Sequence, residues 1–144
     1  MSNWKRFAVV MAVLVSVALP VMVGCNLLQY QFEINNLTSY DLMEVNITAD
    51  GAQSWGSNDL SAILAPGGSE DIKGFAAGEY MVRGVFDVAD AEDDEICGPI
   101  YNDEYLVYNT GIEVTTTNVA IDYSEDVDTE EECTFIYGDV RYII

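Results

Sequence analysis

The chain has 144 residues, with 25 aspartates and glutamates, five lysines and arginines, and no histidine. Its formal charge of −20 argues against nucleic acid and anionic membrane surfaces as partners, because both need basic patches. The absence of histidine removes the commonest general base and every histidine-dependent triad, and it leaves no His/Cys set for zinc. We therefore expect no catalytic residues and predict that the protein is not an enzyme.

The first 25 residues have the pattern of an export signal. Lys5 and Arg6 precede an uncharged apolar stretch over residues 7–23, and the sequence "MVGC" at residues 22–25 overlaps the end of this stretch. Small or apolar residues directly before a cysteine resemble the lipobox of bacterial lipoproteins. The resemblance implies that residues 1–24 are a signal peptide and that Cys25 is lipidated. An uncleaved signal anchor is the alternative, and both interpretations export the rest of the chain.

By the same resemblance, Asn26 after the cysteine implies sorting to the outer membrane in a cell with two membranes. We expect an exported protein, anchored to the bacterial cell envelope through lipid on Cys25. Residues 25–28 are then a short tether, and residues 29–144 form one domain of ordinary size. Only Lys73, Arg83 and Arg141 are basic beyond Cys25, so the mature formal charge is −22.

Apolar and polar residues alternate with a period of two, which predicts strands rather than helices. The strands that we predict cover residues 30–35, 43–48, 78–88, 111–123 with a bulge near Asn118, and 133–144 with a tight turn at Gly138-Asp139. The segment "NDLSAIL" has room for one helical turn. Seven or eight strands in about 120 residues predict an all-β fold, in which two antiparallel sheets pack face to face as a sandwich.

Four motifs between residues 36 and 83 resemble a known kind of domain. They are "NLT" at 36–38, "WGSNDL" at 55–60, "LAPGGS" at 64–69 and "GEYMVR" at 78–83. This succession resembles that of small exported bacterial β-sandwich domains of immunoglobulin-like type. The resemblance implies the fold and no established activity. Trp55 has two interpretations: an aromatic that caps one end of the core, or an exposed ligand-binding residue in a sugar-binding loop.

Cys97 and Cys133 are predicted to form a disulfide, because an exported domain matures in an oxidising compartment. The bridge closes a loop of about 37 residues, for which chain entropy gives on the order of 4 kcal/mol of stabilisation.

A run of carboxylates precedes each of these cysteines. If the bridge brings the runs together, with Glu95 near Glu132, a hard cation with oxygen ligands would relieve the repulsion between them. The candidate calcium ligands are Asp90, Glu92, Asp94, Glu95, Asp126, Asp128, Glu130 and Glu132. Solvated loop charges and adaptation of the whole surface to a salty medium are the competing interpretations.

These observations predict a non-catalytic interaction or structural module of the cell envelope. Its expected partners are the membrane, reached through the lipid on Cys25, and an envelope protein or glycan that the sequence does not specify. The alternative is a calcium-dependent domain that binds carbohydrate or protein with its acidic loops.

Overall fold

The computed structural model describes residues 30–92, 94–115 and 118–143. These residues form seven strands and no helix, and so no helix able to cross a membrane occurs among them. The strands are β1 (Tyr30–Asn36), β2 (Leu42–Ala49), β3 (Ser69–Phe75), β4 (Gly78–Asp87), β5 (Glu104–Val114), β6 (Asn118–Asp128) and β7 (Cys133–Ile143).

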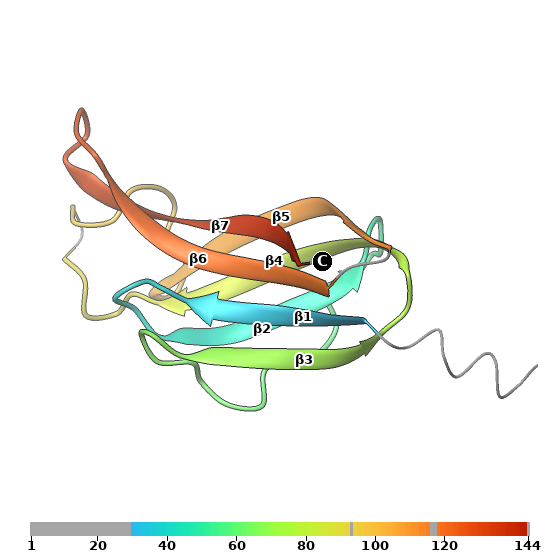
Figure 1. Cartoon of the computed structure of the whole chain (residues 1–144). Coiled ribbons are helices and arrows are strands. Elements are labelled where there is room, and N and C mark those ends of the chain that lie inside the picture. The colour runs from blue at the N-terminus through green and yellow to red at the C-terminus, as the bar shows by residue number, and fades with distance from the viewer. Residues whose placement is uncertain (1–29, 93, 116–117, 144) are drawn as a thin grey trace, which may run out of the picture.

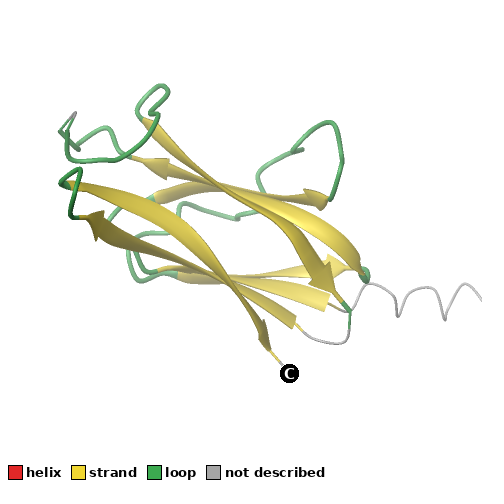
Figure 2. Ribbon diagram, turned by 90° about the horizontal axis from the view of Figure 1, so that it is seen from above, coloured by secondary structure: helices red, strands yellow, loops and turns green. Residues whose placement is uncertain are grey.

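The strands form two sheets packed face to face, which confirms the predicted β-sandwich (Figures 1 and 2). One sheet has the order β3-β1-β6-β7 and the other has the order β2-β4-β5. All neighbouring pairs are antiparallel except β1 and β6, which run parallel. A parallel pair needs a long connection, and here that connection crosses to the other sheet through β2, β4 and β5.

The core lies between the sheets and is built from the inward-facing residues of each strand. Phe32 and Ile34 of β1 face Val82 and Phe86 of β4, and all four side chains are fully buried. The alternating pattern that predicted β1, β2 and β4 thus reflects one face on the core and one face toward solvent.

Tyr123 of β6 spans the centre of this core. Its ring lies edge-on to Phe86, with the ring centroids 5.2 Å apart, and burial raises the pKa of its hydroxyl. Gly84 on the opposite sheet and Gly138 on the neighbouring strand leave the space that the ring fills. Gly138 is therefore a packing residue in a continuous β7, and the predicted turn at Gly138-Asp139 is wrong.

The predicted strand over residues 111–123 is also wrong, because two strands share it. β5 ends at Val114 in one sheet, and β6 begins at Asn118 in the other. The shift of apolar phase near Asn118 therefore coincides with the crossing between the sheets, and the predicted bulge is wrong. The tight turn of the last hairpin lies between Asp128 and Cys133, where Glu132 has a positive φ of 56°.

The sandwich has two distinct ends. β6 and β7 continue to a hairpin turn that lies at the same end as the loop between β4 and β5, which we call the acidic end (Figure 1). β1 starts at the opposite end, since Phe32 of β1 pairs with Val119 near the start of β6 (Figure 1).

Candidate functional site

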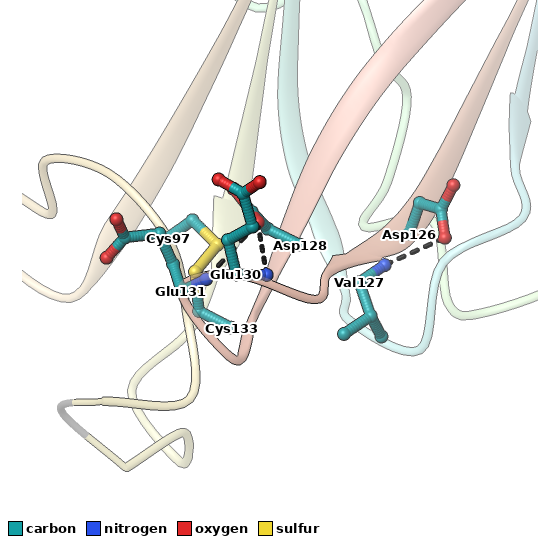
Figure 3. Close-up of a disulfide and its surroundings, with 7 residues drawn as sticks. All are labelled: Cys97, Asp126, Val127, Asp128, Glu130, Glu131 and Cys133. Carbon is teal, nitrogen blue, oxygen red and sulfur yellow. Dashed lines mark hydrogen bonds between the residues drawn. A yellow bond between two sulfur atoms is a disulfide. The ribbon is translucent and has the colours of Figure 1, made fainter.

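The predicted disulfide between Cys97 and Cys133 is present, with a Cα–Cα distance of 5.2 Å (Figure 3). The backbone beside it is held as well. Cys97 donates its N–H to the carbonyl of Thr134 at 2.8 Å, and Thr134 donates to the carbonyl of Glu95 at 2.7 Å. The loop after β4 is thereby attached to the start of β7 as a short parallel bridge, which ties the two acidic runs to one end of the sandwich.

The second acidic run forms the β6–β7 turn. The Asp128 carboxylate accepts the backbone N–H groups of Glu130 and Glu131 at 3.0 and 3.2 Å, which stabilises the turn. Asp126 lies apart from this group and accepts the N–H of Val127 at 2.8 Å (Figure 3). These two carboxylates thus serve the local backbone in this structure.

The first acidic run lines a pocket of about 220 Å³ with the β1–β2 turn. The pocket is lined by Ser39, Tyr40, Asp41, Asp87, Asp90, Ala91 and Glu95. Burial, followed by the nearby carboxylates of Glu95 and Glu125, raises the pKa of the Tyr40 hydroxyl. Ser39 donates its backbone N–H and its hydroxyl to Glu125 at 3.0 and 3.1 Å.

The structure brings some of the candidate calcium ligands together and separates others. Asp90 and Glu95 share the pocket, and Asp87 of the same acidic run and Asp41, neither of them among the predicted ligands, also line it. Asp41 escaped notice because it lies in a turn more than forty residues before the acidic run.

The predicted approach of Glu95 to Glu132 does not give a shared site. The Glu95 carboxylate accepts the N–H of Glu92 and lies beside Tyr40, whereas Glu132 occupies an exposed position in the β6–β7 turn. Asp94 lines a separate hollow with Glu131 beside the disulfide. Within the described residues, no three His, Cys, Asp or Glu side chains are arranged to hold a metal ion.

A second candidate site lies on the outer face of the three-stranded sheet. Asn46, Arg83 and Tyr108 stand directly opposite one another on β2, β4 and β5, so their side chains share this face. Trp55, from the loop after β2, lies with its ring 5.4 Å from the Arg83 guanidinium carbon and 5.8 Å from the Tyr108 ring centroid. We call Trp55, Arg83 and Tyr108 the aromatic platform.

Asn46 holds the platform in place from below. Its side chain is fully buried, and its Oδ1 accepts two hydrogen bonds from Arg83, from Nε at 3.0 Å and from Nη2 at 2.8 Å. Its Nδ2 donates to Glu44 at 2.9 Å and to the Ser57 carbonyl at 3.1 Å. One buried amide therefore connects the guanidinium to the loop that carries Trp55.

The "WGSNDL" motif fixes that loop along the edge of β2. Asn58 accepts the N–H of Val45 at 3.1 Å, and Asp59 accepts the N–H of Ile47 at 2.7 Å. Gly56 has a φ of 76°, which favours glycine directly after the tryptophan. Burial raises the pKa of Asp59, and the bond from Ile47 opposes the shift. The Asn58 and Asp59 side chains thus accept backbone N–H groups that a neighbouring strand would otherwise bind at the edge of β2. Trp55 is not among the residues of the core.

Comparisons with known proteins add little to this geometry. No family model matches the chain, and no curated protein matches it. A solved structure, the NMR structure of a protein from Eubacterium rectale, is similar over 75% of this chain and 85% of its own, with 14% identity and a TM-score of 0.41. At that TM-score the likeness supports no conclusion about function.

Proposed function

We propose that the chain is an exported, lipid-anchored β-sandwich of the cell envelope that acts as a non-catalytic binding module. The observation that supports this proposal is the arrangement of the two ends. β1 begins at Tyr30, five residues after Cys25, at the end opposite the acidic end (Figure 1). Five residues of extended chain span at most about 18 Å, so a lipid on Cys25 would keep that end of the sandwich close to the bilayer.

Two of the three cations that follow Cys25 lie near the start of the sandwich, although Glu79 and Glu113 also pair at this end. Lys73 pairs with Gln31 near the start of β1, and Arg141 pairs with Ala120 near the start of β6, so both cations lie toward the anchored end. The acidic loops lie at the opposite end of the sandwich, away from the bilayer (Figure 1).

Fractionation of cells that express the full chain tests the anchor. The wild type should sediment with membranes and dissolve only in detergent. The Cys25→Ser protein should move to the soluble exported fraction or accumulate as an uncleaved precursor. The double variant Cys97→Ser/Cys133→Ser is the control. It also replaces cysteines with serine but keeps Cys25, so it should remain membrane-bound. A Cys25→Ser variant that still sediments as a processed, detergent-extractable protein would contradict the lipid anchor.

Calcium binding at the acidic end is the second function that we propose. The specific observation in its favour is that Asp41, Asp87, Asp90 and Glu95 line one pocket. They do not form a ready ligand set, so a cation would have to draw them together.

A thermal melt separates a specific site from general screening. If calcium binds there, millimolar calcium should raise Tm by several degrees more than sodium chloride at matched ionic strength. Asp90→Asn/Glu95→Gln should lose this gain, and Glu113→Gln, an exposed carboxylate on β5, should keep it. Equal effects of sodium and calcium would refute the proposal.

A further inference from the structure

The aromatic platform combines one exposed ring with a half-buried ring and a half-buried guanidinium. Tyr108 is 54% exposed, although it is large and partly apolar, and the Trp55 ring lies beside it at an interplanar angle of 42°. The Asn46 amide that orients Arg83 is fully buried. The buried amide therefore fixes the guanidinium, and the Trp55 ring packs against both the guanidinium and the Tyr108 ring.

The charge of the platform is compensated locally. Arg83 is 3.9 Å from the Glu44 carboxylate, and its Nη1 is not used by Asn46 or by Glu44. An anionic ligand would share the guanidinium with the Glu44 carboxylate and would be repelled by a chain of formal charge −20. A neutral ligand that accepts and donates hydrogen bonds meets no such penalty.

The size of the platform favours a small or repeating ligand over a protein. A stable protein interface covers about 800 Å² on each partner, whereas an aromatic side chain buries about 150–250 Å² even when it is wholly covered. Two partly exposed rings and one guanidinium fall well below that requirement. A sugar ring needs only one aromatic face and a few polar groups around its rim.

We infer that the aromatic platform binds the pyranose rings of a neutral polysaccharide. The C–H bonds on one face of a pyranose carry partial positive charge and are attracted to the negative face of an aromatic ring. Tyr108 supplies the exposed ring, Trp55 flanks it, and Arg83 and Glu44 supply a planar donor and a planar acceptor for neighbouring hydroxyls. This inference deepens the proposed binding function, but it does not depend on the lipid anchor.

Fluorescence of Trp55 tests the inference directly. The chain has two tryptophans, Trp4 and Trp55, so the full-length chain with Trp4→Phe reports only on the platform. In mild detergent it is titrated with cellohexaose, maltohexaose and chitohexaose. We expect a saturable change in emission with at least one of them. Binding of chitohexaose alone indicates a cell-wall glycan as the source, and binding of a glucose oligomer indicates an external polysaccharide.

Variants assign the binding to the platform. Tyr108→Ala should raise Kd at least tenfold, and Tyr108→Phe should stay within about threefold, because it keeps the ring. Tyr101→Ala is the matched control, since Tyr101 is 65% exposed but belongs to the acidic end, and its Kd should stay within about twofold. The inference is overturned if none of the three sugars binds, if Tyr108→Ala binds as the wild type does, or if a calcium chelator abolishes binding.

The anchor and the platform can fail independently. A chain that sediments with membranes through Cys25 but binds no sugar would refute only the inference about the platform. A chain that binds sugar but needs no lipid to reach the membrane would refute only the anchor.

Discussion

Gly84→Ala tests the packing at the centre of the sandwich. An added Cβ would lie 2.8 Å from both Cζ and Oη of Tyr123 and 3.0 Å from its Cε1, well inside the 3.5–4.0 Å separation of favourable contact. Overpacking of this kind costs about 1–3 kcal/mol, and the lost freedom of the unfolded chain returns about 0.4–1 kcal/mol. We expect a net loss of about 1–2 kcal/mol in the free energy of unfolding, measured by denaturant titration.

Tyr123→Phe shows whether the tyrosine is the cause of that loss. Its hydroxyl is buried and finds no hydrogen-bond partner among the described residues, so its removal from the wild type should cost little. In the Tyr123→Phe background one of the close contacts is gone, and Gly84→Ala should cost at least about 0.5 kcal/mol less than in the wild type. A Gly84→Ala protein within about 0.5 kcal/mol of the wild type would refute the packing argument.

Three other changes test the loops and the second sheet. Cys97→Ser/Cys133→Ser should lower the free energy of unfolding by about 4 kcal/mol, and a loss below about 1 kcal/mol in a non-reducing buffer would contradict a stabilising bridge. Asn58→Ala should cost about 1–3 kcal/mol, because the buried N–H of Val45 loses its acceptor, and an unchanged denaturation midpoint would show that water replaces the amide. The hydrogen bonds from Arg141 and then from Asn35 hold the pKa of Asp122 below its usual 3.8. A carboxylate whose pKa is lower in the folded state stabilises the fold above the unfolded-state pKa, and this stabilisation is lost as the pH falls through the folded-state pKa. Asp122→Asn should therefore be less stable than the wild type at pH 7, and the difference in stability should shrink below pH 4. A gap in Tm that stays constant from pH 7 to pH 2 would contradict this assignment.

The local alternation of apolar and polar residues was enough to predict most of the secondary structure. β1, β2 and β4 were predictable because each has one face on the core and one toward solvent, which imposes a period of two on the residues themselves. β3 was not predicted, because only Ile72 of its seven residues is a buried apolar side chain. An edge strand covered on one side needs few apolar residues, and its pattern is correspondingly weak.

Each of the two wrong strand predictions used a local pattern that has two possible structural origins. Glycine marks a tight turn in many sequences, but it also marks a place where a large side chain needs space. Gly138 serves the second purpose for Tyr123, which is fifteen residues away in the sequence and directly opposite in the sheet. The shift of apolar phase near Asn118 is likewise compatible with two structures, a bulge or a crossing between sheets. Only the pairing of β6 with β1 in the tertiary structure distinguishes them.

The two candidate sites differ in the same way. The disulfide was predictable because only Cys97 and Cys133 follow Cys25, so each has one possible partner, and the acidic runs could be located because charge is a property of the residues themselves. The aromatic platform was not predictable as a unit. Trp55, Arg83 and Tyr108 come from a loop and two strands that are separated by more than twenty residues at each step.

The sequence by itself determined the all-β sandwich, the cysteine pair and the strongly negative charge, because alternation, composition and the count of cysteines are local or additive quantities. The tertiary structure decided which residues meet. Strand register places Asn46, Arg83 and Tyr108 in one row across the sheet. Hydrogen bonds between the loop after β2 and the edge of β2 place Trp55 beside Arg83 and Tyr108. Such contacts depend on the pairing of strands that are far apart in the chain, and the periodicity within one strand does not encode this pairing.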